Sequence, residues 1–142
     1  MVSGTLLNEK ALDIGGTLGL TAFNAGPGAA AGEELDRISL MLAKGIKENL
    51  SLQTTAIKIS ENDKEDPSLL LKGYIEEYGQ KNHKINFAVD GEIWLQETGA
   101  KVLIFQTAYV VDLKKEDPQQ VAFRMGQAIG DYIAAHASRS KP

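Results

Sequence analysis

An unbroken alternation of apolar and polar residues from Ile85 to Gln96 is the feature that most constrains the fold. Its apolar series is spaced by two and runs Ile85, Phe87, Val89, Gly91, Ile93 and Leu95. Successive side chains of a strand point to opposite faces, so this period predicts a long strand with one face in the core and one largely in water. The glycine-containing turn Glu97–Ala100 and the apolar run Lys101–Val111 predict that a second strand returns as a hairpin.

Two helices are predicted from apolar residues at spacings of three and four. The first covers Glu33–Leu50, with Leu35, Ile38, Leu42, Ile46 and Leu50 on one face. The second begins at Asp117-Pro118, where aspartate suits the N-cap and proline the first helical position, and it is expected to end near His136. Its apolar face carries Val121, Met125, Ile129, Tyr132 and Ile133.

Three further strands complete the predicted order. They cover Thr17–Phe23, Thr54–Ile59 and Leu69–Tyr78, whereas the glycine- and alanine-rich stretch Asn24–Gly32 predicts a loop. The order is therefore β-α-β-β-β-β-α. It predicts an α/β (α+β) two-layer sandwich, in which a mixed sheet carries two helices on one face.

The length and apolar content fit one domain. The 142 residues, 43% of them hydrophobic, suffice for a core without metal or disulfides. We expect a single domain over residues 1–142, with a flexible N-terminal lead-in at 1–10 and a polar tail at 137–142.

Charge and cysteine content narrow the classes of function. The net charge is −4, which provides no basic stripe for phosphates, so nucleic-acid binding is not expected. The absence of cysteine excludes disulfides and thiolate metal sites in the chain as given. No apolar run is long enough to cross a bilayer, and the start lacks signal-peptide features. The opening residues 1–4 are those expected of a mature exported protein whose signal has been removed.

No motif predicts catalysis, a cofactor or a metal. The glycines at 15–19 and 26–28 lack the spacing of nucleotide-binding loops, and no histidine has a metal-ligand partner at a recognised spacing. The acidic run 61–66 departs from a calcium-binding loop. Asp90 and Glu92 share a strand face, but nothing around them indicates acid/base chemistry. We therefore expect a protein that is not an enzyme and has no catalytic, cofactor or metal site.

Three aromatic residues are candidates for a protein contact. Trp94 is predicted on the wetter face of its strand, and Tyr74 and Tyr78 on one face of a neighbouring strand. Such aromatics bury much area at little entropic cost, so they are plausible contact residues on an uncovered sheet face. If the helices cover that face, the same residues belong to the core.

A ridge of small residues four apart follows the last helix: Ala122, Gly126, Gly130 and Ala134. Such a ridge lets another backbone approach closely. Packing within the chain, against the first helix or the sheet, is the favoured interpretation, and a homodimer contact is the alternative.

Two segments resemble a broad group of bacterial envelope lipoproteins related to the TolB amino-terminal domain and to the curli-assembly lipoprotein. They are LLKGYIEE at Leu70–Glu77 and DGEIWLQETGAKVL at Asp90–Leu103. The resemblance implies a periplasm-facing or outer-membrane protein, anchored by lipid on an N-terminal cysteine and engaged in assembly or transport with other envelope proteins. This chain has no cysteine. The absence is explained if Met1 replaces the lipidated residue, and it counts against the resemblance if Met1 is native.

The resemblance and the lack of catalytic motifs lead to one function hypothesis, a non-catalytic protein-binding or assembly module of the cell envelope. The alternative is a cytoplasmic small-molecule-binding module, indicated by the glycine-rich segment near the first predicted strand.

Overall fold

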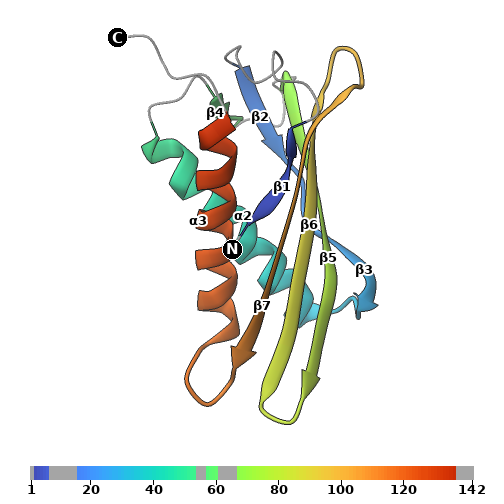
Figure 1. Cartoon of the computed structure of the whole chain (residues 1–142), viewed down its shortest axis with the longest axis vertical. Coiled ribbons are helices and arrows are strands. Elements are labelled where there is room, and N and C mark those ends of the chain that lie inside the picture. Colours follow the sequence, from blue (N-terminus) through green and yellow to red (C-terminus); the bar gives the residue numbers. More distant parts are fainter. Residues whose placement is uncertain (1, 7–15, 54–56, 61–66, 137–142) are drawn as a thin grey trace.

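The fold was examined in a computed structural model that describes residues 2–6, 16–53, 57–60 and 67–136. It is built from two layers, a curved sheet and two helices that cover one face of it (Figure 1). The strands are β1 Ser3–Leu6, β2 Gly16–Leu20, β3 Asn24–Ala29, β4 Ile57–Ile59, β5 Leu69–Lys81, β6 Lys84–Leu95 and β7 Lys101–Asp112. The helices are α2 Glu33–Leu52 and α3 Pro118–His136.

The sheet is mixed, as predicted. Its strand order is β1-β7-β6-β5-β2-β4, and β3 also pairs with β5. The neighbours β1, β7, β6 and β5 pair with one another antiparallel. β2 pairs in parallel with β4 and β5, and β3 pairs in parallel with β5. The first part of β5 pairs with β2, and the part from Tyr74 onward pairs with β3. The predicted two-layer α+β class is therefore confirmed.

The core lies between the helices and one face of the sheet. Both predicted helical faces are buried there except for the half-buried Tyr132, and so is the apolar series of β6 from Ile85 to Ile93. The largest fully buried side chains are Phe87, Leu18, Ile38, Leu42, Ile46, Ile57, Leu71, Ile75, Ile93, Leu103 and Ile129. Burying a residue of this size contributes roughly 1.5–3 kcal/mol relative to its exposed state, so the layers are held together mainly by this interface.

A pair of glycines at the centre of the sheet makes room for two aromatic rings. Gly73 of β5 lies directly opposite Gly91 of β6. A Cβ on Gly73 would overlap the ring of Phe23, and a Cβ on Gly91 would overlap the ring of Phe105. The rings thus occupy the space that side chains would otherwise fill on the core face.

The structure corrects three predictions near the N-terminus. Within the lead-in expected to be flexible over residues 1–10, Ser3–Leu6 forms strand β1, paired antiparallel with β7, and residues 1 and 7–10 lie outside the described residues. The predicted loop Asn24–Gly32 contains β3, a strand without apolar alternation, in which Gly26 and Gly28 let the backbone lie close against β5. The strand predicted over Thr17–Phe23 ends at Leu20.

Side chains satisfy the backbone where β2 gives way to β3. The hydroxyl of Thr21 donates to the carbonyl of Leu71 at 3.2 Å, and the backbone N–H of Phe23 donates to the buried hydroxyl of Ser39 at 2.7 Å. Because these bonds replace those of a continuous ladder, the chain can leave the sheet for a few residues at little cost. The predicted polar tail 137–142, the acidic run 61–66 and residues 54–56 of the predicted strand Thr54–Ile59 lie outside the described residues.

Candidate functional site

The sheet face turned away from the helices is the candidate contact surface. It carries no helix (Figure 1), and residues from β5, β6 and β7 alternate onto it. We call it the open face and define it by Leu70, Lys72, Tyr74, Ala88, Asp90, Glu92, Trp94, Ile104, Gln106 and Ala108. Most of these residues are half-buried by their neighbours.

Trp94 lies on the open face, as predicted, between Leu70 of β5 and Lys101 of β7. The ammonium of Lys72 is 5.0 Å from the centroid of the indole ring, and that of Lys101 is 5.1 Å from it. Cation–π contacts of this kind contribute about 0.5–1 kcal/mol each at exposed sites. The two lysines therefore hold the ring in place against the sheet.

The indole nitrogen of Trp94 is buried and has no hydrogen-bond partner. Buried tryptophan N–H groups usually find an acceptor, and leaving such a donor unsatisfied costs roughly 1–3 kcal/mol. Because the nitrogen is covered, an acceptor could reach it only if the neighbouring side chains moved aside.

Two acidic residues of β6, Glu92 and Asp90, lie on the same face as Trp94. The carboxylate of Glu92 pairs with the ammonium of Lys101 at 2.8 Å. Burial raises the pKa of the Asp90 carboxyl above its ordinary value. Asp90 and Glu92 share a face, as predicted, but the Glu92 carboxylate is already engaged in an ion pair.

Shallow hollows extend along the open face toward β1. One of about 400 Å³ is lined by Ser3, Asp90, Glu92, Ile104 and Gln106 among others. A second, of about 410 Å³, continues over Ala88 and Ala108. Both are open to solvent, so they suit the side chains of a partner rather than an enclosed small molecule.

The predicted pairing of Tyr74 and Tyr78 on one face is wrong. A bulge between Ile75 and Glu77 adds a residue to β5, which reverses the faces beyond it. Tyr74 lies opposite Asp90 on the open face, whereas Tyr78 lies opposite the buried Phe87.

Tyr78 therefore belongs to the helix side of the sheet. Its ring meets that of Phe87 edge-on at 5.3 Å, and its hydroxyl donates to Glu34 of α2 at 3.1 Å. Burial, together with the nearby charge of Glu34, raises the pKa of Tyr78. Its role in these contacts is to join β5 to α2.

The small-residue ridge of α3 packs within the chain. A Cβ on Gly126 would overlap the carbonyl oxygen of Leu42 on α2, and one on Gly130 would lie 2.8 Å from Asn49. Ala122 is fully buried and Ala134 packs against the core. The favoured prediction is confirmed, and the ridge is not available for the alternative homodimer contact.

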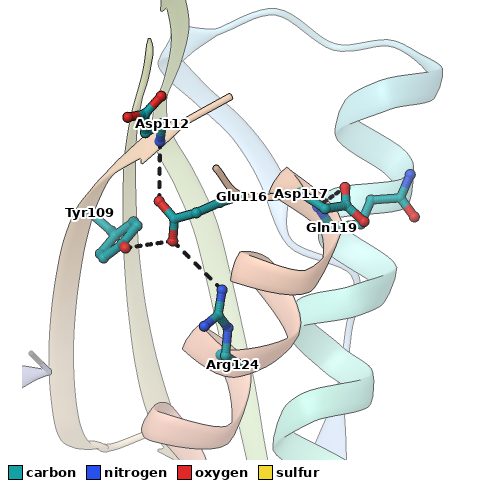
Figure 2. Close-up of polar contacts among 6 residues, drawn as sticks. All are labelled: Tyr109, Asp112, Glu116, Asp117, Gln119 and Arg124. Atoms are coloured by element: carbon teal, nitrogen blue, oxygen red, sulfur yellow. Dashed lines mark hydrogen bonds and ion pairs between the residues drawn. The ribbon is translucent and has the colours of Figure 1, made fainter. Parts of the chain in front are cut away.

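A second polar cluster joins the end of β7 to the start of α3 (Figure 2). Glu116 accepts a hydrogen bond from the Tyr109 hydroxyl at 2.6 Å and one from the Asp112 N–H at 3.2 Å, and it lies 3.7 Å from Arg124. These hydrogen bonds, that of Tyr109 first, lower the pKa of Glu116.

The cap of α3 lies beside this cluster in Figure 2. The Gln119 N–H donates to the side chain of Asp117 at 3.2 Å, so Asp117 caps the helix as predicted. No sequence pattern distinguishes Glu116, because it is a lone glutamate in a charged turn.

The structure was also searched for metal-ligating clusters and membrane-spanning helices among the described residues. Among the described residues, no three metal-ligating side chains come together. Within that same part of the chain, no helix has the length and apolarity needed to cross a membrane. His136 packs edge-on against Tyr132, with their ring centroids 4.7 Å apart.

Comparison with protein-family models and with curated proteins finds no match. The fold is nevertheless shared with solved structures. A PelC dodecamer from Paraburkholderia phytofirmans is similar over 99% of this chain and 100% of that chain, with a TM-score of 0.66 and 12% identity.

Two proteins named as lipoproteins are also similar. One is a putative lipoprotein from Caulobacter crescentus CB15, with a TM-score of 0.54, 14% identity and coverage of 83% of this chain and 88% of that chain. The other is lipoprotein GNA1162 from Neisseria meningitidis, with a TM-score of 0.55, 8% identity and coverage of 84% and 98%. At these identities the likeness establishes a common fold, which this chain shares with two proteins named as lipoproteins.

Proposed function

We propose that this chain is the periplasm-facing domain of an envelope lipoprotein and acts as a non-catalytic protein-binding module. Its contact surface is the open face around Trp94. The observation that carries the proposal is the indole of Trp94 on a sheet face that no helix covers, with the ammonium groups of Lys72 and Lys101 at 5.0 and 5.1 Å from its ring centroid. The fold shared with two proteins named as lipoproteins supports the cellular setting.

The arrangement around Trp94 favours protein binding for a physical reason. Association is opposed by the entropy lost when side chains are immobilised. Here Lys72 and Lys101 already restrict the ring, so less freedom remains to be lost when a partner docks. Tryptophan is also enriched among the residues that dominate binding free energies.

Trp94→Ala is the first test of this surface, with partner capture by photo-crosslinking in cells followed by an affinity measurement on the captured protein. A residue that dominates an interface contributes about 2 kcal/mol or more, so we expect Kd to rise roughly thirtyfold. Leu52→Ala is the matched control, because Leu52 is 79% exposed and lies on α2, away from the open face. Unchanged affinity of the Trp94→Ala protein would remove the contact assignment.

Trp94→Phe separates the two contributions of the indole. It retains an aromatic ring between the lysines but lacks the N–H donor. If the partner supplies an acceptor to that donor, Trp94→Phe should weaken binding nearly as much as Trp94→Ala. If ring area dominates, it should bind almost as well as the wild type.

The cellular setting needs a separate test. Fatty-acid labelling and membrane fractionation of the native full-length gene product should give a labelled product in the membrane fraction. A soluble, unlabelled product would contradict the lipoprotein proposal and favour the cytoplasmic alternative.

A further inference from the structure

Two turns of the chain meet at one end of the molecule. One joins β5 to β6 around Asn82, and the other joins β7 to α3 over Leu113–Asp117; both lie at the lower end in Figure 1. The backbone N–H of Leu113 donates to the carbonyl of His83 at 2.8 Å, so the two turns are fixed side by side. They therefore form one continuous surface.

Four lysines lie on this surface, two from each turn: Lys81, Lys84, Lys114 and Lys115. We call this surface the lysine end. All four residues are exposed, and none of their ammonium groups forms an ion pair with an acidic side chain in the described part of the chain. Such a group of unpaired cations contrasts with the chain as a whole, whose net charge is −4.

The carboxylates of the same two turns are engaged by other donors. The side chains of Asp112 and Asp117 accept backbone N–H groups at 3.0 Å and 3.2 Å. The carboxylate of Glu116 accepts the Tyr109 hydroxyl and pairs with Arg124 (Figure 2). The lysines of this end thus have no counter-ion of their own in these turns.

The composition of the lysine end suits an anionic surface better than a protein partner. Apolar and aromatic residues dominate the binding free energy of protein interfaces. Leu113 is the one large apolar residue of the two turns, and it is half-buried. A layer of anionic lipid headgroups requires no such anchor, because it attracts lysines that lie near it by charge alone.

The direction of β1 relates the N-terminal side of the domain to the same end. Ser3 lies opposite Gln106 and Leu6 opposite Leu103, so the chain moves away from the lysine end as it runs along β1. From Gln106 to Asp112, where β7 reaches that end, the strand covers about 20 Å. A lipid attached upstream of Ser3 would therefore lie on the side of β1 that leads to the lysine end.

We propose that the lysine end docks on an anionic membrane surface, with its four ammonium groups among the lipid phosphates. The inference rests on the proposed envelope setting, and it orients the domain relative to the membrane. It uses neither Trp94 nor the rest of the open face, which stays available to a protein partner.

The test is cosedimentation of the 142-residue chain with two kinds of vesicle. One kind is phosphatidylcholine alone, and the other is equal parts of phosphatidylcholine and the anionic phosphatidylglycerol. We expect binding to the anionic vesicles only, and the binding should weaken as salt is added, because salt screens exposed charges.

Paired substitutions locate the contact. Lys81→Gln with Lys84→Gln removes two ammonium groups from one turn, and Lys114→Gln with Lys115→Gln removes two from the other. A lysine near an anionic bilayer raises partitioning about fivefold, so each pair should lower the partition coefficient roughly 25-fold. Circular dichroism should stay unchanged, since these ammonium groups have no partner in the described part of the chain.

A matched pair on α2 is the control. Lys44→Gln with Lys47→Gln makes the same change in net charge at exposed positions outside the two turns, and it should leave vesicle binding nearly unchanged. A loss as large as that of the lysine-end pairs would overturn the proposal, because binding would then depend on net charge rather than on this surface.

Three further outcomes would also overturn it. They are no binding to the phosphatidylglycerol vesicles at low salt, equal binding to both kinds of vesicle, and retention on immobilised polyglutamate without vesicle binding, which would indicate an acidic protein as the partner. The chain as given has no cysteine to carry a lipid, so the vesicle result is independent of fatty-acid labelling. A labelled native product combined with no vesicle binding would remove this orientation and leave the envelope setting in place.

Discussion

At the scale of single residues, glycines set how closely neighbouring groups approach. Gly91 lies under the ring of Phe105, whereas Gly79 on β5 has no heavy atom within 4 Å of where a Cβ would be. The two glycines look alike in the sequence, and only their neighbours distinguish them.

Gly91→Ala should destabilise the fold by about 1–3 kcal/mol, because the added methyl group forces the Phe105 ring out of its place. Gly79→Ala should be neutral or stabilising by up to about 1 kcal/mol, since it only restricts the unfolded chain. Urea unfolding of both variants measures the difference. Equal stabilities would show that the ring is not confined by Gly91.

Burial of Asp90 makes the stability of the fold depend on pH. Its pKa is raised by burial, so between its unfolded and folded pKa values the folded state binds more protons. Stability then falls as pH rises through the folded pKa, and the charged carboxylate is disfavoured at neutral pH.

Asp90→Asn removes that charge and should raise the thermal midpoint at pH 7. The gain should shrink at pH 3, where the carboxyl is largely protonated in both states. Glu97→Gln, at an exposed position in the β6–β7 turn, controls for the change in net charge. A gain that is the same at pH 3 and pH 7 would contradict the role of burial.

At the scale of elements, the two helices are joined by backbone contact rather than by large side chains. Gly45 on α2 and Gly126 on α3 face each other, and a Cβ on either would overlap backbone carbonyl oxygen. One turn farther along, Asp131 accepts hydrogen bonds from Asn49 and Gln53, both at 2.9 Å. The backbones of the two helices are thus in contact at Gly45 and Gly126, and hydrogen bonds between polar side chains join the helices near Asp131.

Alanine substitutions along this contact should have graded effects. Gly126→Ala meets the rigid backbone of α2, and we expect a loss of about 1–3 kcal/mol as the helices are forced apart. Gly130→Ala meets the Cβ of Asn49 at 2.8 Å rather than backbone, so a smaller shift of α2 is needed, and alanine favours the helix by about 1 kcal/mol, which offsets part of that cost. Thermal unfolding should therefore rank Gly130→Ala above Gly126→Ala, and the reverse order would contradict the packing described for α3.

At the scale of the whole molecule, one two-layer sandwich presents three different surfaces. The helices cover one sheet face, the open face carries Trp94, and a groove of about 210 Å³ lies between β7 and α3. The proposed partner binding uses the open face, the one sheet face that no helix covers.

The sequence by itself determined the elements whose cause is local. Alternation defined β6, three- and four-residue spacing defined both helices, and Asp117-Pro118 marked the start of α3. These patterns arise from the geometry of one strand or one helix, so no knowledge of neighbours is needed to interpret them. Trp94 was assigned to its face for the same reason.

The tertiary structure alone decided everything that depends on a neighbour. The β5 bulge separated Tyr74 from Tyr78, because one extra residue reverses a strand's faces and leaves no periodic signal. β1 and β3 exist because edges of β7 and β5 accept them, although neither has strand-like alternation. The ridge of α3 could have met another molecule, but the glycine of α2 opposite it placed the contact inside the chain.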